Sequence, residues 1–123
     1  MIPEKLKQVL EYEGVVAIAT QGEEGPHLIN TWNSYVHLVD DEYLLFPAGG
    51  MNKTETNINQ DNNINLTIGS REVDGYHGKG TGFAIKGTAE FLKSGLEYDL
   101  LKESFPWARA AVKVNIESIT QTL

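Results

Sequence analysis

Short strand-like segments, separated by turn-forming residues, are the feature that most constrains the fold of this 123-residue chain. Several of them alternate apolar with polar side chains, as strands do with a period of two. We expect six strands, at residues 15–21, 27–38, 42–48, 64–70, 83–93 and 108–120. Six strands with only short helices between them indicate a mainly β fold, an antiparallel barrel plugged by helices.

Three helices are predicted around these strands. Residues 3–13 begin with Pro3, which suits a first helical position, and end before a glycine. A second helix is expected to begin at Asn52, a favourable N-cap, with Glu55 completing a pattern like a capping box. Residues 96–104 have the pattern of a third, short helix.

Glycines mark two further features. Gly87 lies inside a predicted strand, where an isolated glycine favours a β-bulge. Residues 74–82, DGYHGKGTG, are too rich in glycine for an ordered element, so a mobile hairpin loop is predicted. The spacing fits neither a Walker A motif nor G-x-G-x-x-G, because Phe83 occupies the place of the third glycine.

The composition limits the classes of partner that the chain is expected to bind. The net charge of −7 argues against nucleic acid and against anionic membrane surfaces. The length predicts one domain over residues 1–123. The absence of cysteine excludes disulfides and thiolate-bound zinc and fits a cytoplasmic location. The charged N-terminus does not resemble a signal peptide, and the apolar runs are too short to span a bilayer.

The sequence gives little support for a metal-binding site or for a catalytic serine. His27 and His37 share a strand face but are too far apart to bind one metal ion, and surface histidine is the default for both and for His77. The sequence has no G-x-S-x-G motif.

The segment INTWNSY, residues 29–35, fits neither face of an ordinary strand. Positions 30–35 interleave two aromatic residues with four small polar ones, so neither face reads as core or as solvent. The pattern alone does not explain this mixture.

The segment FPAGGMNKTE, residues 46–55, has the pattern of an anion site. A strand ends, Gly49 and Gly50 follow, and a helix begins beside Lys53 and Thr54. Helix N-termini present unpaired N–H groups, so Lys53 and Thr54 suit a phosphate, while the glycines let the backbone approach a flat ligand. An ordinary glycine turn into a capped surface helix remains the alternative.

Trp107, in FPWARAA, precedes the last predicted strand. It could cap the core or form an aromatic wall for a ligand, and the sequence does not distinguish the two.

Several stretches together resemble a known family. EGVVAIATQGEEGPHLINTWNSY, PAGGMNKTE, GSR, GTGF, PWARAA and the terminal QTL are similar to the small FMN-binding proteins of anaerobic sulfate-reducing bacteria. That family belongs to the split β-barrel class shared with pyridoxamine phosphate oxidases and flavin reductases. The resemblance implies a split barrel and a homodimer with FMN at the subunit interface.

The resemblance also implies roles by position. Asn30, Thr31, Lys53 and Thr54 match phosphate and ribityl contacts, and Ser34 is a further polar position of the same stretch. The other implied positions are aromatics near the isoalloxazine ring (Trp32, Tyr35, Trp107), backbone along its polar edge (Pro47, Ala48, Gly49, Gly50), a residue reaching the other subunit's flavin (Leu123), and an acid near the cofactor that tunes its potential (Glu13). FMN itself requires an anion nest, short polar side chains and aromatic walls in one region.

The sequence departs from pyridoxamine phosphate oxidases at its end. It lacks their C-terminal Arg-x-His pair and closes with IESITQTL instead. We therefore expect an electron-transfer flavoprotein, acting as a homodimer with an unidentified redox partner protein, with no catalytic residue of its own. The alternatives are a small flavin-dependent oxidoreductase, either an NAD(P)H:flavin reductase or a pyridoxamine-phosphate-oxidase-like enzyme, and a module that only stores or senses FMN.

Overall fold

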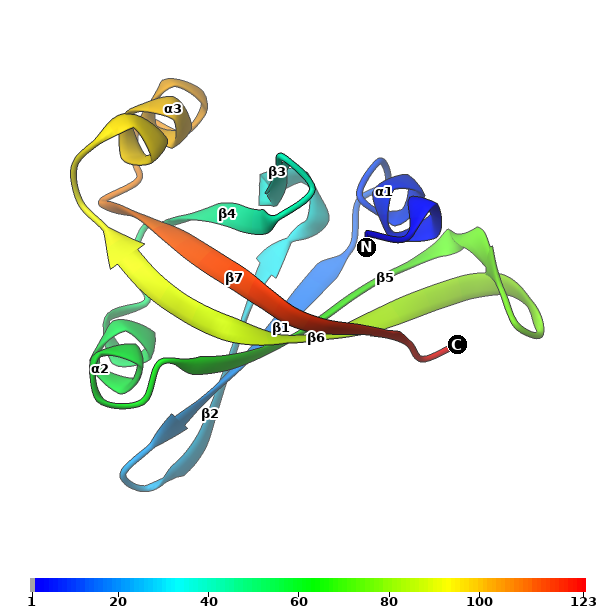
Figure 1. Ribbon diagram of the computed structural model, residues 1–123, viewed down its shortest axis with the longest axis horizontal. Helices are drawn as coiled ribbons and strands as arrows, with labels where there is room; N and C mark the ends of the chain where they lie inside the picture. The colour runs from blue at the N-terminus through cyan, green and yellow to red at the C-terminus, as the bar shows by residue number, and fades with distance from the viewer. Residues whose placement is uncertain (1) are drawn as a thin grey trace.

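A computed structural model describes residues 2–123 (Figure 1). The elements, in chain order, are α1 (Glu4–Val9), β1 (Val15–Gly22), β2 (Gly25–Trp32), the 3-10 helix η1 (Asn33–Tyr35), β3 (His37–Val39), β4 (Tyr43–Ala48), α2 (Asn52–Gln60), β5 (Asn63–Gly75), β6 (Gly78–Leu92), α3 (Leu96–Ser104) and β7 (Ala110–Gln121). The predicted mainly β fold with short helices is confirmed.

The strands form one antiparallel sheet in the order β2-β1-β5-β6-β7-β4-β3. There are seven strands rather than the six predicted, and β2 and β3 end the order without pairing to each other within residues 2–123. The sheet coils strongly, and the long β5–β6 hairpin extends to one side while the β1–β2 hairpin extends downward (Figure 1). The barrel is therefore split rather than closed by hydrogen bonds.

The additional strand arises because Asn33 interrupts the predicted strand 27–38. The Asn33 side chain is fully buried, and its Nδ2 donates to the Tyr12 carbonyl at 2.9 Å and the Gly69 carbonyl at 3.0 Å. Its backbone N–H donates to the Gly14 carbonyl at 2.9 Å. These bonds turn the chain into η1, so side chains after Trp32 no longer alternate, and the mixed pattern of INTWNSY follows.

The prediction of a mobile loop at 74–82 is wrong. β5 runs to Gly75 and β6 begins at Gly78, so only Tyr76 and His77 connect them. Gly78 has a positive φ of 126°, which a tight hairpin turn requires and glycine adopts without strain. The glycines therefore permit close strand pairing instead of loosening the segment.

The predicted bulge at Gly87 is confirmed. Lys86 pairs with Ser118 but Gly87 pairs with Ile116, so β7 contributes one extra residue at this point. A Cβ on Gly87 would collide with the carbonyl of Asn115. Glycine is therefore required where the two backbones approach most closely.

The helices differ from the prediction mainly at their ends. α1 starts after Pro3, which is the N-cap, and the regular helix stops at Val9 rather than residue 13, because the Glu11 and Tyr12 N–H groups donate to carbonyls three residues back instead of four. α3 has the predicted bounds. No helix within residues 2–123 combines the length and apolar character needed to cross a bilayer.

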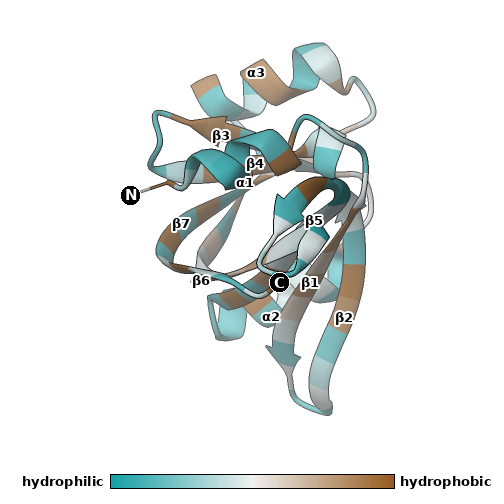
Figure 2. Cartoon of the chain, turned by 90° about the vertical axis from the view of Figure 1, so that its right-hand side faces the viewer, coloured by the Kyte–Doolittle hydropathy of each residue, from teal (hydrophilic) through white to brown (hydrophobic). Residues whose placement is uncertain are grey.

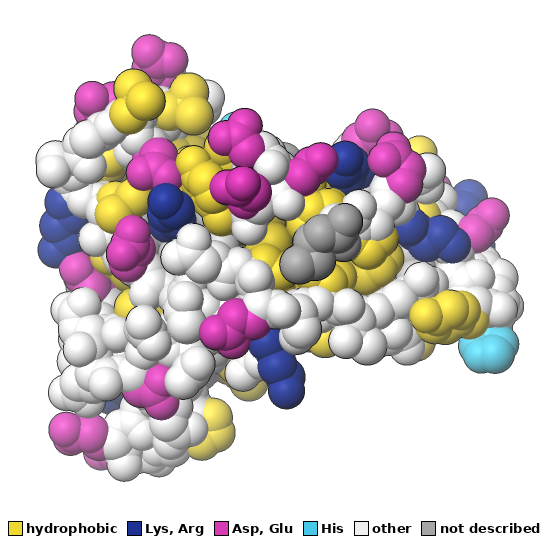
Figure 3. Space-filling model, viewed as in Figure 1, with side chains coloured by type: hydrophobic (Ala, Val, Ile, Leu, Met, Phe, Trp, Pro, Cys, Tyr) yellow, Lys and Arg dark blue, Asp and Glu magenta, His cyan; other side chains and the backbone are white. Residues whose placement is uncertain are grey.

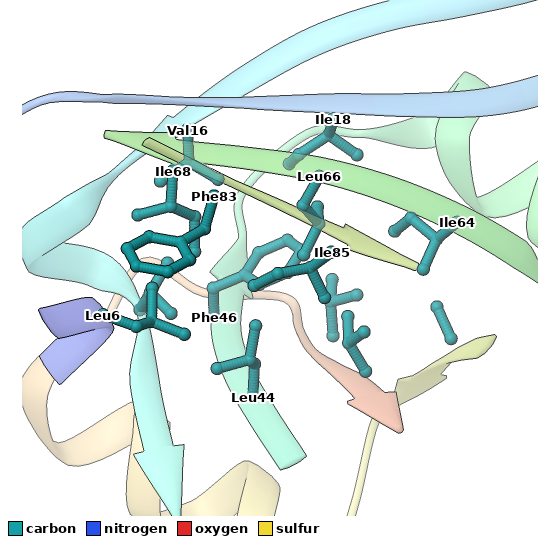
Figure 4. Packing of buried hydrophobic residues seen from close by; sticks show 14 of the residues in the cluster. Leu6, Val16, Ile18, Leu44, Phe46, Ile64, Leu66, Ile68, Phe83 and Ile85 are labelled. Carbon is teal, nitrogen blue, oxygen red and sulfur yellow. The ribbon is translucent and has the colours of Figure 1, made fainter. Parts of the chain in front are cut away.

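The main core lies in the concave side of the coiled sheet. Side chains from β1, β4, β5 and β6 converge with Leu6 of α1, and Figure 4 shows Phe83, Phe46 and Ile68 among the side chains of this cluster. Bands of apolar and polar residues alternate along β2, as expected for a strand at the sheet edge (Figure 2). A smaller core of Leu45, Leu101 and Ala111 lies between α3 and the outer face of β4 and β7.

Candidate functional site

The turn between β4 and α2 carries the predicted anion site. Pro47 and Ala48 are buried at the end of β4, whereas Gly49 and Gly50 are exposed. Met51 has φ 59° and ψ 33°, and this left-handed residue, rather than Asn52, is the N-cap of α2. The backbone therefore exposes two residues without side chains immediately before a helix N-terminus.

The predicted capping box is wrong. No side chain among the described residues caps α2, and the Glu55 carboxylate instead binds two cations. Lys93 Nζ lies 2.7 Å from one oxygen and Arg109 Nη1 lies 2.8 Å from the other. The hydrogen bond from Lys93, followed by that from Arg109, holds the pKa of Glu55 below its usual value although burial opposes the shift.

Arg109 is a residue that the sequence analysis missed. Its backbone N–H donates to the Ala48 carbonyl at 2.9 Å, and its Nε donates to the Gly50 carbonyl at 2.9 Å. With its bond to Glu55 it contacts both sides of the β4–α2 turn. The partners lie more than fifty positions away in the sequence, so no local pattern could have identified them.

Lys53 and Thr54 occupy the first turn of α2. Thr54 is buried, and its hydroxyl oxygen has no hydrogen-bond partner within residues 2–123. Lys53 is exposed, and its Nζ lies 3.9 Å from a carboxylate oxygen of Glu24 in the β1–β2 turn. A cavity of about 430 Å³ is bordered by this ion pair. The turn thus combines a helix N-terminus, a mobile cation and a buried hydroxyl with unused bonding capacity.

At the end of β2, strand alternation directs the predicted site residues to opposite faces of the sheet. Thr31 points inward and is buried, whereas Asn30 and Trp32 are exposed on the outer face. The Asn30 side chain makes a 3.4 Å bond to the Thr31 carbonyl. Asn30 and Trp32 are thus available to a ligand or partner on that face.

Ser34 and Glu13 are joined to each other. The Ser34 hydroxyl donates to the Glu13 carboxylate at 2.6 Å, and the Ser34 backbone N–H donates to it at 3.0 Å. These bonds, the hydroxyl first, hold the pKa of Glu13 below its usual value. Glu13 is therefore anionic at neutral pH and fixed over the start of η1.

An aromatic cluster borders the glycine turn. Ring centroids of Tyr35 and Trp107 are 5.7 Å apart, and Phe105 lies 5.0 Å from Tyr35 and 5.6 Å from Trp107. A Cβ on Gly49 would be 3.2 Å from the Trp107 ring. Trp107 is 52% exposed, so it is a surface wall over the turn rather than a core residue. Of the two alternatives left open by the sequence, the core position is therefore wrong, and a role as a wall for a ligand stays a prediction.

Leu123 lies at the far end of the sheet. Its carbonyl accepts from Thr81 Oγ1 and from Gln121 Nε2, each at 2.8 Å, and its side chain is 62% exposed. A cavity of about 590 Å³ is lined by both Leu123 and Glu13, a volume ordinary for small-molecule sites. The chain therefore brings Leu123 and Glu13 to one cavity, while no contact within residues 2–123 joins Leu123 to Lys53 or Trp107.

The predicted residues thus form three groups. One is the β4–α2 turn with Tyr35, Trp107 and the start of α2; another is the end of β2 with Asn30, Thr31 and Trp32; the third is Glu13 with its partner Ser34 and with Leu123, which lines the same cavity as Glu13. None of the described residues forms a cluster of three or more histidine or acidic side chains able to hold a metal ion.

Comparison with known proteins places this arrangement in a class. The solved structure of HupZ from Group A Streptococcus superposes with a TM-score of 0.82 at 21% identity, covering 98% of this chain and 94% of that one. An FMN-binding protein from Syntrophomonas wolfei superposes with a TM-score of 0.73 at 14% identity, covering 98% and 85%. At these identities the likeness establishes the fold alone, which is that of the split-barrel proteins.

The sequence comparisons go further. The family model described as pyridoxamine 5'-phosphate oxidase matches residues 2–122, and this chain belongs to that family. It is also 50% identical over 123 residues, the full length of both chains, to the FMN-binding protein of Nitratidesulfovibrio vulgaris (strain DSM 19637 / Miyazaki F). The resemblance noted in the sequence is therefore confirmed.

Proposed function

We propose that this chain is an FMN-binding flavoprotein that transfers electrons as a homodimer. The observation that carries the proposal is a junction in one turn: Trp107 forms an aromatic wall over Gly49, and the anion-binding start of α2 follows within three residues. A flat tricycle joined to a phosphate needs these two features side by side. The FMN-binding relative at 50% identity supports the same ligand.

The phosphate would bind at the first turn of α2. Lys53 supplies a cation on a flexible stem, and the helix N-terminus supplies N–H groups and the positive end of its dipole. Arg109 and Lys93 together carry two positive charges against the single carboxylate of Glu55. The local charge is thus favourable to a dianion although the whole chain is acidic.

The ring system would lie against Trp107, Tyr35 and the exposed Gly49–Gly50 backbone. Trp107 and Trp32 are 52% and 42% exposed, so this surface is open on one side in a single protomer. A second copy would complete the enclosure that cofactor sites usually provide. This incompleteness supports the homodimer.

The outer face of the β1–β2 hairpin is the surface we assign to dimerisation. Val15 pairs across the strands with Trp32, and Leu28 lies further along the same face. Their side chains are 54%, 42% and 70% exposed, which makes an apolar surface at the sheet edge. Covering this surface would also carry Leu123 of one copy toward the cofactor of the other.

A flavin-dependent oxidoreductase is the second candidate. The 590 Å³ cavity beside Glu13, lined also by Arg71, has room for a substrate or for a nicotinamide. Electron transfer is favoured because the side chains proposed to contact the ring, Trp107 and Tyr35, include no histidine, cysteine or carboxylate that would act as a nucleophile or general base.

The test begins with the visible spectrum of the purified protein. We expect a yellow protein that releases FMN on denaturation, or an apoprotein that takes up added FMN; a colourless protein that binds none would overturn the proposal. Stopped-flow reduction by NADH or NADPH then separates the candidates. Saturating bleaching indicates the oxidoreductase, and slow, non-saturating bleaching the carrier. If low-potential donors also fail to reduce bound FMN, the protein is a storage or sensing module instead.

A further inference from the structure

Arg109 connects both sides of the β4–α2 turn with a single side chain. Its backbone N–H holds the last residue of β4 through the Ala48 carbonyl, its Nε holds Gly50, and its Nη1 holds Glu55 in α2. The rigid planar fork of a guanidinium can make such bonds in fixed relative directions, whereas a lysine presents one mobile ammonium. The spacing between β4 and α2 is thus set by Arg109, the residue immediately before β7.

The turn itself has little to fix its shape. Gly49 and Gly50 are exposed and have no side chains, and Met51 is in the left-handed region, which non-glycine residues rarely adopt. The Gly50 carbonyl is held from outside the turn by Arg109 at 2.9 Å. Without this bond the backbone that faces Trp107 would gain freedom.

The guanidinium is in turn held from other sides. Lys93 binds the second Glu55 oxygen at 2.7 Å, which prevents that carboxylate from rotating away from Arg109. The Phe91 ring lies 5.9 Å from the guanidinium carbon. The side chain of Glu55 is only 16% exposed, so its pairing with Arg109 is partly shielded from solvent.

One cost accompanies this arrangement. The Nη2 of Arg109 is buried and has no hydrogen-bond partner in the part of the chain that is described. A buried donor without a partner reduces stability. Arg109 leaves its Nη2 unpaired while its other groups bind Gly50 and Glu55. This arrangement is better explained by a need to hold the β4–α2 turn in position than by a contribution to folding alone.

We propose that Arg109 is a positioning residue for the cofactor: by tying Gly50 to Glu55 it holds the Gly49–Gly50 backbone against Trp107, so that the turn and the indole ring form one fixed surface for the flavin. The inference rests on the proposed function, because it concerns the same site. Arg109 does not replace Lys53 as the phosphate cation; its charge is matched by Glu55.

The experiment compares Arg109→Met and Arg109→Lys with Lys113→Met. Lys113 is also a partly buried cation paired with a helix carboxylate, that of Glu97 at 3.0 Å, but its partners Glu97 and Tyr43 are not part of the β4–α2 turn, so Lys113→Met is the matched control. Arg109→Met should weaken FMN binding by about tenfold or more, as measured by calorimetric titration, and shift the visible spectrum of bound FMN. Lys113→Met should keep the wild-type spectrum and an affinity within about threefold of wild type. Arg109→Lys should be intermediate, because an ammonium cannot bond both partners in the same geometry.

Amide hydrogen exchange of the apoproteins gives a readout that needs no cofactor. Exchange at Gly50 and Met51 should accelerate in both Arg109 variants and stay unchanged in Lys113→Met. If Arg109→Met does not fold, Arg109→Lys decides the matter by the same measurements. Wild-type FMN affinity, spectrum and exchange in a folded Arg109 variant would overturn the inference while leaving FMN binding intact. Wild-type protein that binds no FMN would instead overturn the proposed function.

Discussion

The Ser34 hydroxyl donates a 2.6 Å hydrogen bond to the Glu13 carboxylate, and the Ser34 backbone N–H donates a second at 3.0 Å. Two residues that the resemblance places near the cofactor are therefore partners of each other. The Ser34 hydroxyl holds the negatively charged Glu13 carboxylate in position. This arrangement defines what each residue can do for a bound flavin.

Glu13→Gln should raise the reduction potential of bound FMN. A fixed carboxylate near the ring disfavours the anionic reduced flavin, so removing the charge favours reduction. Spectroelectrochemical titration measures the change. Glu11→Gln is the control, since it removes an exposed acid two residues away. A potential that is unchanged or lower in Glu13→Gln would contradict the charge argument.

Lys53→Ala should lower FMN affinity by about tenfold with little change in thermal stability, because Lys53 is exposed and its 3.9 Å pairing with Glu24 contributes little to folding. Glu24→Gln should tighten binding, since it removes the acid that competes with the phosphate for Lys53. Lys79→Ala, which breaks a similar exposed pair with Glu72 at 3.5 Å, serves as the control in calorimetric titrations. Equal affinity in the wild type and Lys53→Ala would remove Lys53 from the site.

Leu28→Glu should convert the proposed dimer to a monomer. The side chain is 70% exposed on the face assigned to dimerisation, and a buried charge there would oppose association. Leu96→Glu is the matched control, because Leu96 is 86% exposed on α3, where Figure 3 shows apolar side chains beside acidic ones at the outer end of the molecule. Sedimentation velocity distinguishes the outcomes. A wild type that is monomeric with FMN fully bound would refute the dimer.

Gly49→Ala and Gly50→Ala should differ. A Cβ on Gly49 would lie 3.2 Å from the Trp107 ring and displace it, whereas a Cβ on Gly50 has no heavy atom within 4 Å. We expect Gly49→Ala to weaken FMN binding by about tenfold and to alter Trp107 fluorescence, and Gly50→Ala to do neither. Similar affinities for the two variants would place the ring elsewhere.

Acid should remove a contribution to stability made by Glu55. Its pKa is lowered in the folded protein, first by Lys93 and then by Arg109, so the stabilisation is present above the unfolded pKa of about 4.3 and is lost as pH falls through the folded value. Glu55→Gln should lower the free energy of unfolding by about 1–3 kcal/mol at pH 7. Urea unfolding should then show a smaller decline from pH 7 to pH 3 in the variant than in the wild type. Parallel declines would mean that Glu55 is not the group responsible.

Strand periodicity predicted most of the sheet because the core strands bury one face each. β1 and β4 fell within one residue of their predicted bounds. The break at Asn33 was not predictable, because its bonds run to the carbonyls of Tyr12 and Gly69, which only the folded sheet brings near. The segment 74–82, DGYHGKGTG, was mispredicted for a different reason. Its glycines suggested a mobile loop, but they allow a two-residue turn between β5 and β6.

The candidate site divides in the same way. Gly49, Gly50 and Lys53 were recognisable because a strand end, glycines and a helix start follow each other within a few residues. Glu55 was assigned to a local cap, yet its partners are Lys93 and Arg109, which lie on later parts of the chain. The sequence pattern therefore indicated the β4–α2 turn as a candidate anion site, but only the tertiary structure shows which side chains fix the position of that turn.

The bulge opposite Gly87 also decides which way the end of the chain faces. Before it, the core side of β7 carries the even-numbered residues Val112, Val114 and Ile116; beyond it, Ile119 continues the same apolar side. Glu117 is the one residue that shifts this phase. Deleting Glu117 would leave Gly87 and Lys86 paired with Ile116 and Ser118 in a regular ladder and would keep Ile119 on the core side. Deleting one residue beyond the bulge would instead turn Leu123 to the opposite face, away from the cavity it now borders. In this protein, therefore, the bulge absorbs one residue of β7, and the direction of Leu123 depends on the number of residues that follow Glu117.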